Sequence, residues 1–562
     1  MFAQLHFDSA HVLVLIAIAT VLYLGLFIIQ YTRYELRIRR LGVRAPVLAQ
    51  NPWTGESPLV HRRRARPAEP PPLRVLRFHV RGGPGRAHGR RLRRGAGDAG
   101  GRPALHHHAG PGARESRAGG PVRPIRQGQG LPHNVEPVPG DSIFTTDGSL
   151  WHDSRGMIRP MFVKDRVSDL VVFERWTAAL VRQIELQRRG LVAGLGEKED
   201  KGCCSGFGEG VVDIQSLFYR MTLDVTTDFL LGVAVDSLNN PRDEFAEAFN
   251  EVQRLQMYLT IVGPFESIMP RGRYRAGIRA IDRFVMPYIE AALALPAAEL
   301  EKRTSSTDFT FLHSVARHTR DPKVLRDQIV AVLLAGRDTT AATLSWAFYE
   351  LSRYPAKVAR LRAEILECVG PAPNTPSYDN LKNMPYLRHV LNETLRLYPA
   401  VPYNLRVALE DTTIPCKEGQ GPPIAVLKDD VVVYSTLSMQ RRRDLYPKYQ
   451  QKSGDGHFAD PALFEPERWE GWAPKPWTYV PFNGGPRICV GQNFALTEMA
   501  YVVFPPLSYP SNIHFLLIVR LLQKYEKIEY VGDWNAQFHE PEVVGRPGQE
   551  VQVRLYEAAS AT

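Results

Sequence analysis

The sequence predicts a mainly α-helical protein with small β-sheets, in which one large domain follows a single N-terminal membrane-spanning helix. Two observations carry this prediction: apolar residues recur at helical spacing over long stretches, and an uncharged apolar run stands near the start. The 562 residues are 44% hydrophobic and 23% charged, which is ordinary for a globular chain long enough to bury a large core. Five scattered cysteines argue against a secreted disulfide framework and favour a reducing compartment.

Residues 1–44 are predicted to be a membrane anchor with a basic flank. The run Val12–Tyr31 has no charged side chain, and as a helix its twenty residues would span about 30 Å, the thickness of a hydrocarbon core. Five arginines follow between Arg33 and Arg44, whereas only Asp8 is charged before the run, so the bulk of the chain should face the cytosol. The alternative is a cleaved signal peptide, which would have a shorter apolar run preceded by basic residues.

Residues 45–138 form an aberrant segment. Between residues 61 and 130, Gly, Pro and Arg occupy 40 of 70 positions, and 17 arginines face only three acids. That stretch alone has a net charge of +14, whereas the whole chain has a net charge of +11. The rest of the chain therefore sums to −3. Too few apolar residues remain to offset the entropy of ordering, so we expect disorder, or a reading-frame slip that ends near Gly140.

Two other functions of this segment are disfavoured. Nucleic-acid binding by the arginines would call for interleaved aromatic residues, and Phe78 is the only one, so no nucleic-acid partner is expected. The adjacent histidines His106, His107 and His108 lack the spacing that metal ligands need on a helix or a strand.

Residues 139–562 are predicted to form the large domain. Asp321 is an N-cap and Pro322 the first residue of a helix of about 33 residues that stops before Pro355 and is apolar enough to cross the middle of the protein. The other expected elements are helices over Leu217–Leu231, Ala246–Leu259, Ile278–Leu295 and Met384–Tyr398, and strands over Ile424–Leu427 and Val431–Tyr434.

A suspect insertion interrupts the end of this domain at residues 504–518. The helical pattern of Gln492–Val503 stops at Phe504–Ile518, which contains adjacent prolines, and resumes at Val519. One hypothesis is an unspliced intron read in frame. The alternative is a real loop between two short helices.

The strongest chemical motif is Phe482–Gly491, which follows the pattern F-x-x-G-x-R-x-C-x-G directly before a helix. Cys489 stands where free helix N–H groups favour a thiolate. Gly485 and Gly491 let the backbone approach the sulfur and a flat ligand, and Arg487 can reach an anionic group on that ligand. A buried structural cysteine would not need this frame.

The second motif lies in the middle of the long helix. Asp338 and Thr339 are polar in an apolar stretch, which is costly unless they have partners or a task. Gly336 is one turn before Thr339, so a kink or widened groove can form between them. The alternative for Thr339 is a core threonine whose hydroxyl is satisfied within the helix.

Two further charged residues are singled out by spacing. Glu393 and Arg396 are three residues apart on one helix face and can form an ion pair. Trp151 and Arg155 are one turn apart, and Arg406 follows a proline-rich turn. For both of the latter arginines, a merely solvated side chain is an equally open interpretation.

The cysteine motif resembles the haem-binding loop of the cytochrome P450 family, and the resemblance implies the cytochrome P450 fold with haem b as cofactor. Cys489 would then be the axial thiolate ligand of the iron, with Phe482 packed beside it. The implied roles of the other residues are haem propionate contacts for Trp151, Arg155, Arg406 and Arg487, a dioxygen slot at Gly336, proton delivery by Asp338 and Thr339, and a structural lock of Glu393 and Arg396 with the segment that contains Arg468.

The combined motifs resemble fungal microsomal enzymes that hydroxylate n-alkanes and fatty acids at the terminal carbon. The resemblance implies a monooxygenase that inserts one oxygen atom of O2 into a C–H bond of a hydrophobic small molecule, with electrons from NADPH through NADPH–cytochrome P450 reductase and with cytochrome b5 as a further partner. It also implies a single pass through the endoplasmic reticulum membrane, contact with its lipids and a cytosolic catalytic domain. Drug-like, sterol and polycyclic substrates stay open.

The alternative is an inactive or misfolded membrane-anchored product of a faulty gene model or pseudogene. It arises because residues between the anchor and Trp151 depart from the family pattern.

Overall fold

The computed structural model describes most of the chain from Val138 onward and a short helix near the start. The described residues are 25, 28–41, 125–126, 138–162, 171–191, 210–262, 269–302, 310–374, 376, 380, 383–415, 422–446, 449–450, 458–470, 472–492, 494–495, 517–541 and 543–558. Most of the predicted run Val12–Tyr31 and nearly all of the arginine-rich segment lie outside them. None of the described helices combines the length and the apolarity that crossing a bilayer requires.

Helices dominate the described chain, as the sequence predicts. The α-helices are α3 Gly148–Ile158, α5 Val171–Arg188, α6 Ile214–Leu231, α7 Glu244–Val262, α8 Gly272–Ala294, α9 Ala297–Lys302, α10 Phe311–His318, α11 Pro322–Arg353, α12 Pro355–Cys368, α14 Pro385–Leu397, α15 Thr436–Met439 and α17 Leu517–Lys524. Short 3-10 helices are η1 Arg159–Phe162, η4 Pro466–Trp469 and η5 Gly485–Arg487.

The described chain also contains short β-strands, which pair into small sheets. They are β1 Ile125–Arg126, β2 Val211–Asp213, β3 Tyr403–Ala408, β4 Thr412–Ile414, β5 Ile424–Val426, β6 Val431–Ser435, β7 Tyr449–Gln450, β8 Phe458–Ala459, β9 Tyr525–Tyr530, β10 His539–Pro541, β11 Gly545–Pro547 and β12 Gln552–Glu557.

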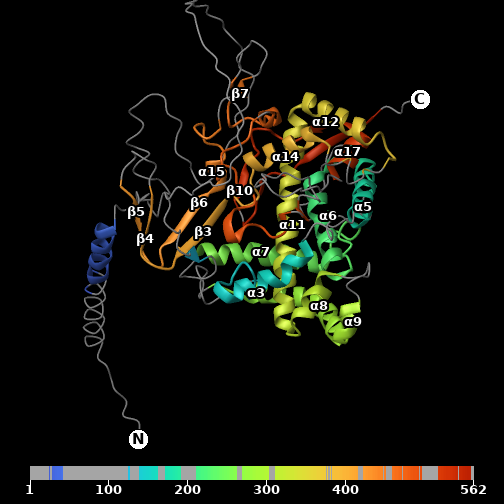
Figure 1. The fold of residues 1–562 in the computed structure, drawn as a ribbon. Coiled ribbons are helices and arrows are strands. Elements are labelled where there is room, and N and C mark those ends of the chain that lie inside the picture. Colours follow the sequence, from blue (N-terminus) through green and yellow to red (C-terminus); the bar gives the residue numbers. More distant parts are fainter. Residues whose placement is uncertain are drawn as a thin grey trace, which may run out of the picture.

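Helix α11 lies at the centre of the helical part of the molecule (Figure 1). The side chain of Asp321 accepts two backbone N–H groups of its first turn, and Pro322 has no N–H that would need a partner there. The helix ends at Arg353, close to the predicted stop. Most side chains between Leu325 and Ser352 are buried, so the helix crosses the core as predicted.

Helix α6 packs along α11 and is held in place at both ends. At its start, the Asp213 carboxylate accepts a hydrogen bond from the Ser216 N–H at 3.0 Å. At its end, Gly232 takes the left-handed conformation with φ of 77°, which glycine adopts at low cost. These two signals explain why the helix covers Ile214–Leu231, slightly more than its apolar pattern alone predicts.

The sheets are small, as the sequence predicts, but the strands are more numerous than the two whose ranges it predicts. The predicted pair exists as β5 and β6. In addition, β3 pairs with β1 and β6, and β12 lies between β2 and β9. The partners β2 and β12 are more than 300 residues apart, with Val212 opposite Val553. Strands of two to six residues are too short for a period to reveal, so only their long-range partners define them.

The helix of residues 28–41 docks onto the β4–β5 hairpin, beside which Figure 1 draws it in blue. Ile38 is buried against Ala425 and Leu427. Arg37 forms an ion pair with Asp411, which lies one residue before β4. The basic flank of the predicted anchor therefore belongs to the folded domain and is more than a linker.

Two predicted boundaries need correction. Val138, assigned to the aberrant segment, is buried, and its carbonyl accepts a hydrogen bond from Arg326. Leu517 and Ile518, assigned to the suspect insertion, begin α17 and are fully buried. In both places the side chains join the main core, which a local composition shift does not reveal. The rest of residues 504–518 lies outside the described residues.

Candidate active site

The loop Phe482–Gly491 folds back on itself. The Cys489 N–H donates to the Phe482 carbonyl at 3.0 Å, and the Ile488 N–H donates to the Gly485 carbonyl at 3.1 Å. Gly485 has φ of 71°, in the left-handed region that favours glycine. The ring of Phe482 packs against the main core. The spacing between the phenylalanine and the cysteine is thus the spacing of a closed turn.

The turn is tightest at Gly484, which the motif does not single out. A Cβ atom at Gly484 would lie 2.3 Å from the ring of Trp477, so no larger residue fits without movement of that ring. A Cβ at Gly491 would meet Phe162 at 3.7 Å, an ordinary contact. Among the described residues, close approach therefore limits Gly484 and not Gly491.

A helical turn follows the loop directly, as the sequence predicts. The Ala495 N–H donates to the Gly491 carbonyl at 2.9 Å, which is a first helical hydrogen bond. Cys489 therefore lies two residues before a helix N-terminus. Most of the predicted helix Gln492–Val503 lies outside the described residues.

The thiol of Cys489 is exposed to solvent, although surrounding protein atoms raise its pKa. Two features oppose that desolvation: the backbone N–H of Gly491 and the positive charge of Arg155 both favour the thiolate. These two neighbours are the groups that would stabilise the sulfur as a thiolate when it binds a metal ion.

Arg155 and Arg406 both lie within electrostatic range of Arg487. Burial lowers the pKa of Arg487 most, Asp147 opposes this, and Arg406 and Arg155 lower the pKa further. Among the described residues, neither Arg155 nor Arg406 forms an ion pair with an acid. A cluster of half-buried cations with one acid between them favours an anionic ligand.

Arg487 makes three hydrogen bonds to the segment before α3. It donates to the carbonyls of Ile143 and Thr146, both at 3.1 Å, and to the carboxylate of Asp147 at 2.8 Å. Its guanidinium also lies over the ring of Trp151, 4.3 Å from the centroid. The structure therefore joins the cysteine loop to the start of α3, and it pairs Arg487 with an acid that sequence reasoning missed.

The middle of α11 opens to solvent on one face. Leu334, Ala335, Gly336 and Thr339 are partly exposed, whereas the residues before and after them are mostly buried. The hydroxyl of Thr339 donates to the Ala335 carbonyl at 2.7 Å, which is the local satisfaction left open as an alternative. Its remaining lone pairs can still accept a hydrogen bond. No described hydrogen bond links this face to Cys489.

Asp338 is buried beside Arg337. Burial raises the pKa of its carboxyl, and the opposing effects of Arg337, the Gln253 side chain and Arg546 do not cancel that rise. Arg337 Nη1 lies 3.3 Å from Asp338 Oδ1, but this oxygen accepts no hydrogen bond among the described residues. Asp338 therefore holds a proton more readily than an exposed aspartate.

Gly336 serves helix packing. A Cβ atom there would lie 3.1 Å from the side chain of Thr226 on α6, so the glycine lets α11 and α6 approach closely. Helix α11 is one helix through this point. The kink or widened groove predicted between Gly336 and Thr339, and the dioxygen slot that it would provide, remain proposals.

Glu393 and Arg396 form a fully buried pair on α14. Arg396 donates to both carboxylate oxygens of Glu393, at 2.8 and 2.7 Å. The same carboxylate accepts from Arg468 at 3.4 Å, from the Trp469 ring N–H at 3.1 Å and from the Glu465 N–H at 2.9 Å. The structure thus brings together the two segments that the sequence paired. We call Glu393, Arg396 and Arg468 the buried triad.

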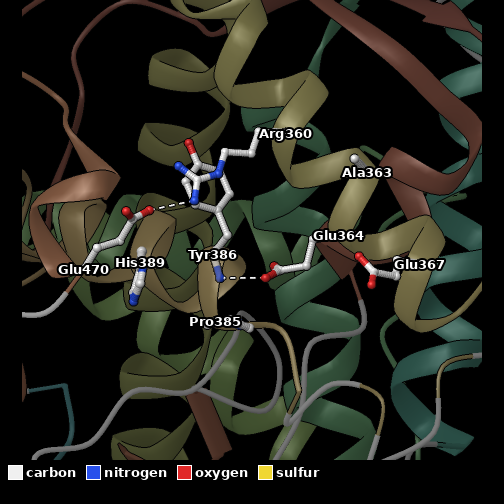
Figure 2. Close-up of a pocket in the computed structure, with 8 residues that line it drawn as sticks. All are labelled: Arg360, Ala363, Glu364, Glu367, Pro385, Tyr386, His389 and Glu470. Carbon is white, nitrogen blue, oxygen red and sulfur yellow. Dashed lines mark hydrogen bonds and ion pairs between the residues drawn. The ribbon is translucent and has the colours of Figure 1, made fainter. Parts of the chain in front are cut away.

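A surface hollow between α12 and α14 contains none of the predicted site residues (Figure 2). It is lined by Arg360, Ala363, Glu364, Glu367, Pro385, Tyr386, His389 and Glu470. The Glu364 carboxylate accepts the Tyr386 and Leu387 N–H groups at the start of α14, and Arg360 pairs with Glu470 at 2.6 Å. These contacts engage Arg360, Glu364 and Glu470, whereas Nδ1 of His389 has no hydrogen-bond partner among the described residues.

Three residues that matter at the site escaped the sequence: Asp147, Gln253 and Gly484. Asp147 precedes α3 and looks like a helix N-cap, but its side chain makes no cap hydrogen bond. Its partner Arg487 is 340 residues away, so no local pattern could reveal the pair. Gln253 lies on α7, where only packing brings it to Asp338.

Comparison with known proteins assigns this chain to a family. A cytochrome P450 family model matches residues 129–507. The chain is 46% identical over 428 residues to cytochrome P450 monooxygenase pvhE of Talaromyces variabilis, covering 74% of each chain. It is 38% identical over 427 residues to cytochrome P450 52A1 of Candida tropicalis, covering 70% of this chain and 72% of the relative.

A further relative is cytochrome P450 52A13 of Debaryomyces hansenii, which is 37% identical over 420 residues and matches 71% of this chain and 72% of its own length. The range that the family model matches begins at residue 129, inside the segment predicted to be aberrant, and ends at residue 507, inside the suspect insertion.

Proposed function

The chain belongs to the cytochrome P450 family, and from this premise we propose that it hydroxylates the terminal carbon of n-alkanes and fatty acids. That it is a monooxygenase follows from the family, whereas the substrate class is the proposal. It is supported by the motifs that resemble fungal alkane and fatty-acid hydroxylases and by identities of 36–38% with several fungal members named 52A. The comparisons lend no support to the alternative of an inactive product.

The observation that carries the haem assignment is the accessible thiol of Cys489 beside a cluster of arginines. Members of this family hold haem iron through a cysteine thiolate, and haem b carries two anionic propionates. Cys489 would hold the iron, and Arg155 and Arg406, which lack an acidic partner among the described residues, would face the propionates. When bound, the haem supplies the activation of dioxygen that amino-acid side chains cannot perform.

The side chains of α11 would manage protons. Burial raises the pKa of the Asp338 carboxyl, so this acid binds a proton more readily than an exposed aspartate does. The hydroxyl of Thr339 is the adjacent polar group on the partly exposed face, and its oxygen can accept a hydrogen bond from a water molecule while its own hydrogen points to the Ala335 carbonyl. We propose that these two residues control proton delivery at the Thr339 Oγ1 atom.

Electrons would come from NADPH through NADPH–cytochrome P450 reductase, with cytochrome b5 as an additional partner. We place the enzyme at the endoplasmic reticulum membrane with its catalytic domain in the cytosol. The support is the apolar run Val12–Tyr31, which leads directly into the helix that docks on the β4–β5 hairpin. A membrane-held enzyme can take long apolar substrates from the bilayer.

The experiment that tests this proposal is reconstitution of the full chain with a fungal reductase and NADPH. A strongly red-shifted absorption band of the reduced, carbon monoxide-bound protein is expected, together with conversion of hexadecane and palmitic acid to terminally hydroxylated products. A matched Thr339→Ala variant should keep the band and form less product per NADPH. Oxidation of a sterol or polycyclic compound with no action on either chain substrate would overturn the substrate class.

A further inference from the structure

A closed ring of contacts joins α11 to the turn after α14 and to the β10–β11 hairpin. Trp346 on α11 is buried, and its ring N–H donates to the carbonyl of Gly545 on β11 at 3.3 Å. The N–H of Gly545 donates to the carbonyl of Ala400 at 2.9 Å. Tyr398, two residues before Ala400, stacks on Trp346 with centroids 4.0 Å apart and planes 5° apart. One indole ring thus holds two segments that are far apart in the chain.

Two further contacts fix the members of this ring. The Tyr398 hydroxyl donates to the carboxylate of Glu350, one turn further along α11 than Trp346. The ring of His539 on β10 lies nearly parallel to Trp346, with centroids 5.8 Å apart and an angle of 13°. Burial lowers the pKa of His539 to about 4, so at pH 7 this ring is neutral and stacks without a charge to desolvate.

Gly545 is required by this arrangement. A Cβ atom at Gly545 would lie 2.1 Å from the ring of His539, so a larger residue would displace that ring. The glycine also supplies both the carbonyl that accepts from Trp346 and the N–H that donates to Ala400. The side chains of Trp346 and His539 and the backbone of Gly545 therefore depend on one another.

The held turn covers α11 beside Thr339. Val544, one residue before the glycine, is buried against Ala342 and Ala400. Thr339, Ala342 and Trp346 follow one another at helical spacing, so they share one face of α11. The apolar turn therefore borders the partly exposed face that carries the Thr339 hydroxyl.

The position of such a border decides which carbon of a flexible chain can react. Neighbouring carbons of an alkyl chain differ by one C–C bond length, and a displacement of about 1 Å is enough to change which atom is held for reaction. Val543, next to Val544 at the tip of the hairpin, is an exposed apolar side chain. A turn with these two valines can contact a hydrocarbon, and its value for selection depends on being held still.

We propose that Trp346 and His539 are positioning residues that fix the β10–β11 turn beside Thr339, and that the fixed turn makes the enzyme select the terminal carbon of its substrate. Both side chains are buried and in contact with the protein, so they act through the turn. The inference rests on the terminal hydroxylation proposed above and adds the residues that determine it.

Product analysis of Trp346→Phe tests the proposal, because phenylalanine keeps an aromatic ring and removes the N–H that holds Gly545. The full haem-loaded chain is supplied with a fungal reductase, NADPH and palmitic acid. The ratio of terminal to subterminal hydroxylation should fall by about tenfold, while the red-shifted carbon monoxide band keeps its height. Trp176→Phe is the matched control, since it removes the ring N–H bond from a tryptophan on α5 to Asp228 and should leave the ratio unchanged.

Changes at the other two members of the arrangement separate positioning from a general loss of stability. His539→Ala and Gly545→Ala should lower the same ratio, whereas His539→Phe restores a neutral ring and should keep it. Amide hydrogen exchange of residues 539–547 without substrate reports on the turn itself. It should be about tenfold faster in each variant that lowers the ratio. If Trp346→Phe loses the carbon monoxide band, Gly545→Ala decides the question.

Two results overturn the proposal. In the first, exchange of the turn is faster but the product ratio is unchanged, which would mean that the turn does not select the carbon. In the second, exchange is unchanged in Trp346→Phe, His539→Ala and Gly545→Ala, which would mean that these residues do not hold the turn. If the unmodified chain hydroxylates neither palmitic acid nor hexadecane, the proposed function fails and the selection fails with it.

Discussion

The arginines of the buried triad and the arginines near Cys489 differ in burial and in charge pairing. The side chain of Arg396 has no exposed surface. Its guanidinium donates hydrogen bonds to Glu393 and to the carbonyls of Gln440, Pro461 and Leu463. Arg155 is partly exposed and, with Arg406, meets no acid among the described residues. The arginines of the buried triad are thus buried and paired with an acid, whereas Arg155 and Arg406 are partly exposed and have no acidic partner among the described residues.

The difference teaches what each set is for. At Glu393 burial alone would raise the pKa of the carboxyl, but Arg396 and Arg468 outweigh it and hold the pKa below its ordinary value. A buried charge that is fully paired costs much if one partner is lost. Near Cys489, unpaired cations repel one another, so the protein alone gains nothing from gathering them. We infer that the buried triad stabilises the fold, whereas the arginines near Cys489 are placed to bind an anionic ligand.

The largest expected effect is that of Cys489→Ser. The red-shifted carbon monoxide band and hydroxylation should both be lost, because serine supplies no thiolate, whereas the free energy of unfolding of the haem-free chain should change by less than about 0.5 kcal/mol at this exposed position. Spectra and thermal unfolding measure the two sides. Cys368→Ser is the control and should keep the band, and a band that survives Cys489→Ser would refute the ligand assignment.

The next effect should come from the triad. Arg396→Met leaves Glu393 buried without its main partner, so the free energy of unfolding should fall by about 3–5 kcal/mol and folded protein should hardly accumulate. Denaturant unfolding and soluble yield measure the loss. The matched control is Arg254→Met, which breaks an exposed arginine–glutamate pair of the same i,i+3 spacing and should have little effect. An equal fall in the unfolding free energy of both variants would contradict the idea that burial makes the triad pair more important than an exposed pair.

A smaller effect is expected for Arg155→Gln. Removing one of the gathered cations should weaken haem retention by about tenfold and leave the unfolding of the haem-free chain unchanged or slightly improved, because like charges no longer repel. Haem titration and thermal unfolding separate the two readouts. A marked loss of stability without haem would mean that Arg155 belongs with the triad in its role.

The smallest effect should appear on acidification. Because the pKa of Glu393 is lowered from its ordinary 4.5, the stability it contributes is present above pH 4.5 and is lost only as the pH falls through the lower folded value. The difference in unfolding free energy between the unmodified chain and Glu393→Gln should therefore stay constant from pH 7 to 5 and shrink below 4.5. Urea unfolding at each pH measures it, and a difference that shrinks already at pH 6 would contradict the lowered pKa.

Much of the helical scaffold follows from local sequence, because helix starts, stops and apolar periods are written in neighbouring residues. Asp321 and Pro322 mark the start of α11, and its unbroken apolar pattern marks its central position. The i,i+3 spacing of Glu393 and Arg396 likewise predicts their pairing. Strands such as β2 and β12 could not be predicted, since a strand of three to six residues is stabilised by a partner that can lie anywhere in the chain.

The same division runs through the candidate site. By itself the sequence determined the cysteine loop, its glycine at Gly485 and the helix that follows, because backbone conformation there depends on the residues within the loop. Only the tertiary structure decided that Asp147 pairs with Arg487, that Gly336 makes room for Thr226, and that the face of Thr339 stays open. Charge pairing and helix approach depend on distances between segments far apart in the chain, and these distances exist only once the core has packed.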